Sequence, residues 1–323
     1  MSDALADAGV VRISVPTPFI VGPVNVYVIK QDPPILIDTG PRVPGAFEVI
    51  EEGLAREGLA VRDLAAILIT HAHVDHIGLT GQLVAESGAT TFAHPDAAAQ
   101  TQNYDEDAEQ ALAYYQKILL EFGVPDDVAQ RTALERAKYR PYGERVQIDH
   151  ILEDGIRVGS FRTHFVPGHS SSDVLFHNES NGIAFVGDHL LKNMNPNPLI
   201  RLSPGKEPRA KALIELHESL ARTRALDIQW VCPGHGAPFT DHQTVIDKLI
   251  GKNEDRTTRI ADFLSNGPMS PYAVTKSLFP NLEEAHVYLG LSVAVGHLEV
   301  LEDRKLATSS LNDGLVEYTL AQS

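Results

Sequence analysis

Short apolar runs alternate with helical patterns along the first part of the chain. Runs of aliphatic and β-branched residues that fit buried strands occupy 10–15, 24–29, 34–38, 64–70 and 90–93. The segments 44–56 and 77–86 between them have patterns typical of helices. Strand, loop and helix in repetition predict an α/β fold in which helices cover layered sheets.

Strand patterns return over 156–165, 174–177, 183–186 and 228–231, with helices expected over 207–224 and 242–264. After the Asn-Gly-Pro turn at 266–268 the pattern changes to two helices, 270–278 and 283–301, and a hairpin around the Asn-Asp-Gly turn at 312–314. This order outlines a small winged-helix unit. We therefore expect a large domain over residues 1–254 and a winged-helix-like domain over 255–323.

The segment 96–147 breaks the alternation. One stripe of an amphipathic helix is formed by Leu112, Tyr115, Leu119 and Phe122. Five of the nine tyrosines lie in this segment, and tyrosine gives a pocket an apolar wall with a polar tip. The segment is either an ordinary helical hairpin or a lid over a pocket, and the two interpretations are compatible.

The composition narrows the class of protein. Of 323 residues, 43% are hydrophobic, which excludes a wholly disordered chain. The formal charge of −16 argues against electrostatic binding of nucleic acid or of an anionic membrane over a broad surface. The single cysteine, Cys232, excludes an internal disulfide and thiolate-rich zinc modules. No apolar run is long enough to span a bilayer and the N-terminus lacks a signal-peptide pattern, so we expect a cytoplasmic protein without membrane or nucleic-acid partners.

A histidine-rich string follows the strand expected at 64–70. Within six residues it supplies His71, His73, Asp75 and His76. Imidazole nitrogens and a carboxylate oxygen are ligands that a divalent metal such as zinc accepts. Along an extended or tight-loop backbone, we expect His71 and His73 to point one way and Asp75 another. Because one ion cannot easily use all four groups at this spacing, the string predicts a site for two ions.

Further candidate ligands also follow strand patterns, each beside a glycine that lets the backbone turn tightly. They are His169 in Pro-Gly-His-Ser, Asp188 in Val-Gly-Asp-His and His235 in Pro-Gly-His-Gly. Each alone is weak evidence for a ligand, because a Gly-His or Gly-Asp pair after a strand is more often part of a turn or a capped loop. Together, in this order after the histidine string, they indicate a metal centre.

In this order the motifs resemble those of the metallo-β-lactamase superfamily, over residues 10–264 with 96–147 as a helical insertion. The resemblance implies a four-layer αβ/βα sandwich with metal ions at the sheet edges. It implies a first metal held by His71, His73 and His169, a second held by Asp75, His76 and His235, and a bridging ligand at Asp188. Asp38, in the Asp-Thr-Gly run at 38–40, matches an early acidic element of the family and would orient a ligand rather than bind metal.

Aspartate at position 188 bears on the subtype. β-Lactamases of this fold typically have cysteine near this position, whereas glyoxalase II-like thioesterases, lactonases and ribonucleases have aspartate. The resemblance therefore implies a hydrolase with two divalent ions, expected to be Zn²⁺, with Fe or Mn as alternatives. Two such ions lower the pKa of a shared water and give a bridging hydroxide at neutral pH. As the catalytic residue, Asp75 would orient this nucleophile or relay a proton.

Three activities are left open. The leading prediction is hydrolysis of a small-molecule thioester, ester or lactone, in a pocket to which His189, Tyr104, Tyr142 and Asn193 contribute. An endoribonuclease or phosphodiesterase of the same fold is disfavoured, because residues 255–323 contain five basic side chains against nine acidic ones. A mononuclear iron sulfur dioxygenase is third, since one ion would not need Asp75, His76 and His235 together. The C-terminal unit is then expected to be a structural or dimerisation module, consistent with a homodimer.

Overall fold

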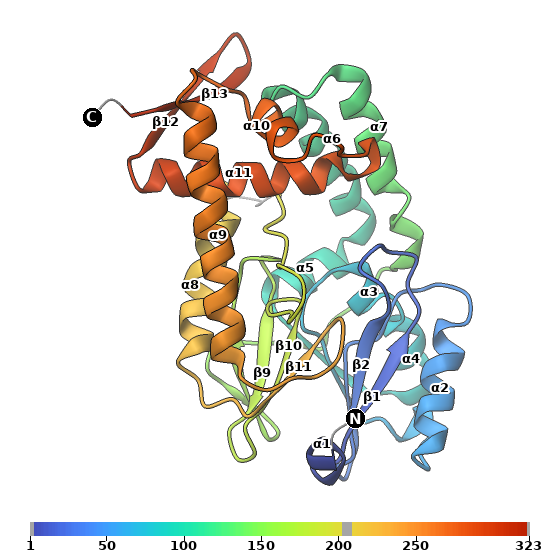
Figure 1. The fold of residues 1–323 in the computed structure, drawn as a ribbon. Helices are drawn as coiled ribbons and strands as arrows, with labels where there is room; N and C mark the ends of the chain where they lie inside the picture. The colour runs from blue at the N-terminus through green and yellow to red at the C-terminus, as the bar shows by residue number, and fades with distance from the viewer. Residues whose placement is uncertain (1–2, 202–208, 322–323) are drawn as a thin grey trace.

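Two facing β-sheets form the centre of the protein. The computed structural model describes residues 3–201 and 209–321, and its ribbon is drawn in Figure 1. The first sheet has six strands in chain order: β1 (Val10–Val15), β2 (Val24–Ile29), β3 (Ile35–Ile37), β4 (Ala66–Leu68), β5 (Thr90–Ala93) and β6 (His150–Ile151). The second has five strands in the order β11 (Trp230–Pro233), β10 (Ile183–Gly187), β9 (Val174–Asn178), β8 (Phe161–Phe165) and β7 (Arg157–Val158).

Apolar side chains from both sheets meet between them. Tyr27, Ile37 and Leu68 of the first sheet share a buried cluster with Phe176 and Phe185 of the second. The rings of Tyr27 and Phe185 pack edge to face, with centroids 5.2 Å apart. Strands buried on both faces explain why the sequence pattern is a set of continuous apolar runs rather than strict alternation.

Helices cover the outer faces of the two sheets (Figure 1). The first sheet is covered by α2 (Ala46–Arg56) and α4 (Thr80–Ser87), and the second by α8 (Ala212–Arg224) and α9 (His242–Leu264). Helix, sheet, sheet and helix give four layers, which confirms the predicted α/β fold class. Two residues of the helix expected at 207–224, positions 207 and 208, lie outside the described part of the chain.

The strand directions bring polar loops to one edge of the sandwich. Strands β3, β4 and β5 are mutually parallel, and so are β10 and β11. β8 and β10 are both antiparallel to β9 and therefore run the same way. The residues that follow these strands consequently meet at the same sheet edges, as the ends of parallel strands do.

Shorter elements complete the body. They are α1 (Asp3–Asp7), the single turns η1 (Val61–Asp63) and η2 (Arg140–Tyr142), α3 (Val74–Ile77) and α5 (Pro95–Gln102). The helix expected over 77–86 is observed as α4, and Ile77 instead ends the preceding helix α3. Between the two helices, Gly78 lies close to the chain at Tyr142, because an added Cβ would be 2.3 Å from the carbonyl oxygen of Tyr142.

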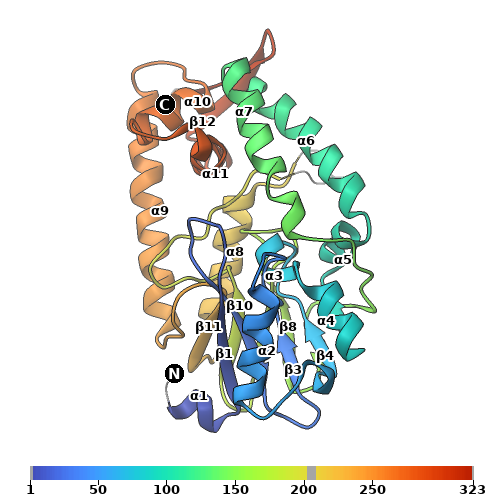
Figure 2. The ribbon, with the colours of Figure 1, turned by 90° about the vertical axis from the view of Figure 1, so that its right-hand side faces the viewer.

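The insertion forms two long helices, α6 (Tyr104–Glu121) and α7 (Asp126–Ala137), which rise from the sandwich toward the C-terminal unit (Figure 2). The stripe residues Tyr115, Leu119 and Phe122 are buried against Tyr288 and Leu291 in the C-terminal unit. Sequence periodicity predicts this apolar face correctly. What the face packs against is a long-range contact that periodicity does not encode.

The C-terminal unit contains α10 (Pro271–Leu278), η3 (Glu284–His286), α11 (Val287–Asp303) and the hairpin β12 (Ala307–Asn312) and β13 (Leu315–Leu320). Helix, helix and hairpin follow in the expected order, and the winged-helix assignment stays a prediction. Helix α9 runs without a break across the predicted boundary at 254: Ile246 packs on the sandwich, whereas Ile260 packs on the C-terminal unit. Among the described helices, none has both the length and the apolar character needed to cross a bilayer.

Leu119 tests the packing of the insertion. It is fully buried, whereas its neighbour Leu120 is 44% exposed on the same helix. We expect Leu119→Ala to lower the free energy of unfolding by about 2–5 kcal/mol, because it leaves a cavity between α6 and α11. Leu120→Ala is the matched control and should change it by less than about 0.5 kcal/mol. Equal effects of the two substitutions in urea titrations would contradict the observed packing.

A buried carboxyl in α11 predicts a pH dependence of stability. Glu299 is 4% exposed and pairs with Arg209. Burial raises its pKa to about 7, against the opposing charges of Arg209 and Lys211. The folded protein therefore binds this proton more tightly than the unfolded chain, so the contribution of Glu299 to the free energy of unfolding falls as pH rises between about 4.5 and about 7.

Glu299→Gln removes this titration. The difference in free energy of unfolding, wild type minus variant, should fall across that window and be constant above about pH 8. Urea titrations at a series of pH values measure it. A difference that does not change with pH would show that Glu299 does not hold its proton more tightly in the folded state.

Candidate metal centre

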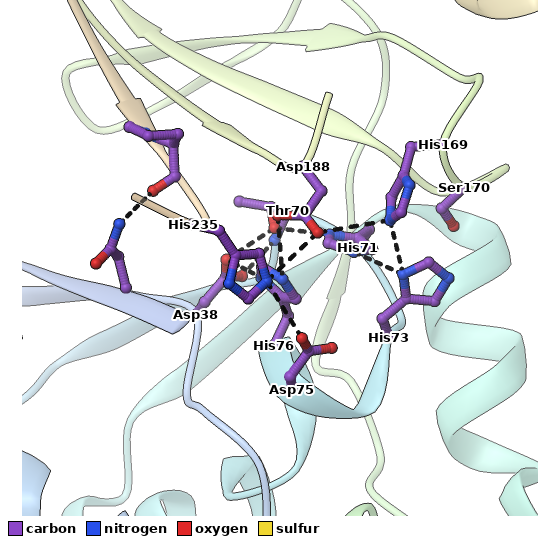
Figure 3. A network of polar contacts seen from close by, with 12 residues as sticks. Asp38, Thr70, His71, His73, Asp75, His76, His169, Ser170, Asp188 and His235 are labelled. Carbon is purple, nitrogen blue, oxygen red and sulfur yellow. Dashed lines mark hydrogen bonds and ion pairs between the residues drawn. The ribbon is translucent and has the colours of Figure 1, made fainter. Parts of the chain in front are cut away.

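Seven histidine and aspartate side chains converge where the two sheets present their strand ends (Figure 3). They come from four parts of the chain, which follow β4, β8, β10 and β11. The full set comprises His71, His73, Asp75, His76, His169, Asp188 and His235, and all of these are buried except the half-buried His73. The sequence motifs predict each of them as a ligand, and the fold brings all of them together.

The first group consists of His71, His73 and His169. The Nδ1 atom of His73 lies 3.0 Å from Nε2 of His71 and 2.9 Å from Nε2 of His169. Three ring nitrogens thus point at one another, although His169 lies almost a hundred positions from the other two. Such nitrogens are the usual ligands of a tetrahedral zinc site.

The second group consists of Asp75, His76 and His235. Nε2 of His235 lies 3.3 Å from Oδ2 of Asp75. The side chain of Asp188 stands between the two groups. Its Oδ1 atom is 3.5 Å from Nε2 of His76, and its Oδ2 atom is 3.5 Å from Nε2 of His235 and 3.7 Å from Nε2 of His169. One carboxylate therefore reaches both groups.

The residues present fit divalent metal ions, because several of their buried polar atoms lack partners. Nε2 of His76, Nε2 of His235 and Oδ1 of Asp188 are buried and have no hydrogen-bond partner among the described residues. Buried polar atoms without partners are costly. Two divalent cations would satisfy these atoms and neutralise the paired carboxylates.

A buried carboxylate orients one of these rings. Asp38 accepts a hydrogen bond of 2.7 Å from Nδ1 of His76, so that Nε2 of this ring faces the second group. The same carboxylate accepts two further hydrogen bonds, both 2.8 Å, from the backbone N–H and the hydroxyl of Thr70. Asp38 adopts a left-handed conformation with φ 59°, and these three hydrogen bonds help to hold it there.

Backbone carbonyls orient two more rings. Nδ1 of His169 donates to the carbonyl oxygen of Asn197 at 3.1 Å. Nδ1 of His235 donates to the carbonyl oxygen of Pro23 at 2.9 Å. In both rings Nε2 is left to face the centre. The sequence did not predict these two carbonyls, or Thr70 as a partner of Asp38, because hydrogen bonds between distant segments leave no local signal in the sequence.

Burial and neighbouring charges set the protonation of the cluster. Burial lowers the pKa of His73 to about 3, and nearby His169 lowers it further, so this ring is neutral and able to bind metal. Burial also opposes charge on His76, but the carboxylates of Asp38 and Asp188 raise its pKa well above the ordinary value. Burial opposes the charge of Asp188 too, yet His76 and His235 hold the pKa of this carboxyl below its ordinary value.

Part of the segment 71–76, which was expected to be extended or a tight loop, is helical. Residues 74–77 form the short helix α3, which His73 precedes in an extended conformation. The helical turn carries both Asp75 and His76 into the second group, while His71 and His73 stay with the first. A helical turn, rather than alternation along the backbone, therefore separates Asp75 and His76 from His71 and His73.

The four residues expected in a substrate pocket lie in different surroundings. His189 is fully buried, and its ring meets the hydroxyl of Thr223 in α8 at 2.9 Å. Tyr104 donates to the carbonyl oxygen of Arg140 within the insertion, and Asn193 is exposed. Tyr142 packs beside α3, since its carbonyl oxygen lies close to Gly78.

Tyr142 belongs to an aromatic rim that sequence reasoning did not identify. The ring of Phe19 lies 5.1 Å from that of Tyr139 and 5.9 Å from that of Tyr142, both edge to face. Ile20, next in the loop between β1 and β2, is 81% exposed. This loop ends at Pro23, which holds His235. The sequence did contain a signal for this rim, namely the apolar pair Phe19 and Ile20 in a short loop between prolines. Exposed apolar residues of this kind often mark a contact surface.

Gly234 tests how closely the backbone approaches the cluster. A Cβ there would lie 2.4 Å from Oδ1 of Asp188 and 2.6 Å from Cε1 of His76. We expect Gly234→Ala to displace these groups and to weaken metal binding by about 10–100-fold, the range found when ligand orientation is disturbed. Metal per chain after dialysis against buffered zinc measures the effect.

Gly251→Ala is the matched control. A Cβ at Gly251 in α9 meets nothing within 4 Å, so this variant should keep the wild-type metal content. Wild-type metal content in Gly234→Ala would show that the cluster does not bind metal in the observed arrangement.

Comparison with known proteins gives the family. Residues 20–235 match the family model of the metallo-beta-lactamase superfamily. The probable metallo-hydrolase YqjP of Bacillus subtilis (strain 168) is 35% identical over 306 residues, which cover 93% of this chain and 94% of the relative.

Two solved structures have a similar fold. One is a metallo-beta-lactamase family protein from Thermus thermophilus, 24% identical, with a TM-score of 0.78 and coverage of 97% of this chain and 98% of that one. The other is a beta-lactamase domain protein from Burkholderia ambifaria, 22% identical, with a TM-score of 0.80 and coverage of 97% and 92%. These two matches concern the fold, whereas the family model and the relative aligned along most of its length show that the chain belongs to the metallo-β-lactamase superfamily.

Proposed function

We propose that this protein is a hydrolase that uses two divalent metal ions to cleave a small-molecule thioester, ester or lactone. The observation that carries the proposal is the carboxylate of Asp188, whose oxygens lie within 3.7 Å of ring nitrogens from both groups. A ligand shared in this way fits a pair of ions better than a single one. The similarity to a protein described as a probable metallo-hydrolase supports the same reaction class.

The seven side chains divide between two ions in this proposal. His71, His73 and His169 would hold one ion, Asp75, His76 and His235 the other, and Asp188 both. Histidine with carboxylate favours zinc, and iron or manganese would accept the same donors. When bound, such ions lower the pKa of water and polarise the carbonyl group of a substrate.

Asp75 is the candidate for handling the proton. Its side chain is 12% exposed, against 1% for His235 beside it. Although burial opposes its charge, the nearby rings of His76 and His235 lower the pKa of Asp75, which keeps it a carboxylate at neutral pH. A carboxylate in this place can orient an attacking water by accepting its hydrogen bond and can receive its proton.

The aromatic rim favours an apolar acyl group on the substrate. Apolar surface is provided by Phe19, Ile20, Tyr139 and Tyr142, on a loop and a helical turn. Both contact the cluster of seven candidate ligands, called the metal cluster below, or its flanking segment. The loop does so because Pro23 accepts a hydrogen bond from His235, and the turn because Tyr142 packs against the segment that follows α3. A small acyl group could desolvate against these rings while its carbonyl faces the cluster.

A substrate panel tests the proposed function. Acyl thioesters, lactones, phosphodiesters and β-lactams are offered to zinc-, manganese- and iron-loaded protein. We expect turnover of thioesters or lactones, and a loss of kcat/KM of at least about 100-fold in Asp75→Asn and Asp188→Asn, the size expected when a group that transfers protons or holds the metals is removed.

Asp262→Asn is the matched control, because it removes an exposed carboxylate of α9 outside the cluster and should leave kcat/KM unchanged. Turnover of phosphodiesters alone would overturn the acyl-substrate assignment. One iron per fully active chain, with no second ion, would overturn the two-metal assignment.

A further inference from the structure

A recess separate from the metal cluster lies where α8, α9 and α11 meet. It has a volume of about 250 Å³. Its apolar lining includes Leu213 of α8, Pro198 and Phe279, and its polar lining includes Asn197 and Asn253. The segment after Asp188 supplies one wall, so the recess borders the loop that leaves the metal cluster.

A basic groove adjoins this recess along α9. The groove has a volume of about 550 Å³ and is lined by Lys252, Arg256 and Arg259, together with Asn195 and Asp255. Arg256 and Asn195 line both the recess and the groove. Positions 252, 256 and 259 fall on one face of a helix. Three cations against one carboxylate make this groove an exception in a chain with a formal charge of −16.

Arg256 has no anionic partner here. It is half-buried, and among the described residues none forms an ion pair or hydrogen bond with it. Other half-buried arginines do have partners: Arg201 pairs with Glu215, and Arg209 with Glu299. Partial burial, with Arg259 nearby, lowers the pKa of Arg256. A guanidinium that is partly desolvated and unpaired is suited to receive an anion from outside the protein.

One residue of the recess lining, Asn197, also contacts the candidate metal centre. The backbone carbonyl of the same residue accepts the hydrogen bond of His169. A ligand in the recess would therefore contact the residue that orients a candidate metal ligand.

We propose that the recess and groove form a binding site for an organic phosphate. In this site Arg256, Arg259 and Lys252 hold the phosphate group, and the less polar part of the ligand packs against Phe279, Leu213 and Pro198. An arginine side chain can donate two parallel hydrogen bonds to the oxygens of a phosphate. The apolar wall would contact the organic part of the ligand, which inorganic phosphate lacks. The proposal does not depend on which bond the metal centre cleaves.

Binding of phenylphosphonate tests the site, because this probe combines a stable phosphorus oxyanion with an apolar ring. Calorimetry on the metal-loaded protein measures its affinity. We expect binding that weakens with salt and is reduced about tenfold or more in Arg256→Gln, as loss of a charged hydrogen-bond donor predicts. Inorganic phosphate should bind more weakly than phenylphosphonate.

Two controls separate this site from other anion sites. Lys248→Gln removes a cation of the same helix one turn before the groove and should leave the affinity unchanged. Asp188→Asn alters the metal cluster and should also leave it unchanged. Equal affinity in wild type and Arg256→Gln, or loss of binding in Asp188→Asn but not in Arg256→Gln, would overturn the proposal. Melting temperatures near that of the wild type establish that the variants are folded.

Kinetics distinguish two sources of the phosphate. If it is part of the substrate, Arg256→Gln raises KM for a phosphate-bearing substrate about tenfold and leaves kcat, and the KM of an uncharged analogue, unchanged. If it belongs to a separate effector, phenylphosphonate changes the turnover of the uncharged substrate in wild type but not in Arg256→Gln. Either result supports the site, whereas phenylphosphonate effects that are identical in the two proteins would contradict it.

Discussion

The buried carboxylate of Asp38 connects the strand ends on which the metal cluster depends. It accepts hydrogen bonds from the backbone and hydroxyl of Thr70, two residues after β4, and from the ring of His76, further along the same segment. Asp38 itself follows β3, so one side chain fixes the ends of two adjacent strands and the orientation of a candidate ligand. Removing it would leave several buried donors without a partner, and such donors are costly.

Asp188 has the corresponding place in the second sheet. It follows β10 and faces ring nitrogens contributed by both halves of the sandwich. The apolar layer between the sheets holds these strand ends in register, because its side chains are close-packed and cannot shift independently. The cluster is therefore a product of the sandwich as a whole. Neither sheet alone supplies all seven of the clustered side chains.

The segment from Asp188 to Ile200 links the cluster to the upper part of the molecule. Its carbonyl at Asn197 orients His169, and Ile200 is buried with Tyr115 and Leu291, between the insertion and α11. The insertion and the C-terminal unit thus pack against each other beside the loop that leaves the cluster (Figure 2).

Local signals in the chain were enough to predict the α/β class, most strand positions and the identity of the clustered residues, because apolar runs and His-Asp motifs are themselves local. The resemblance to the superfamily, rather than a local signal, located Asp38 through its Asp-Thr-Gly run. The folded arrangement was needed to show that α3 separates the two groups, that His189 turns toward Thr223, and that Tyr115 packs on the C-terminal unit. The carbonyls of Pro23 and Asn197, the rim around Phe19 and the unpaired Arg256 likewise arise from contacts between distant segments, and no local pattern encodes such contacts.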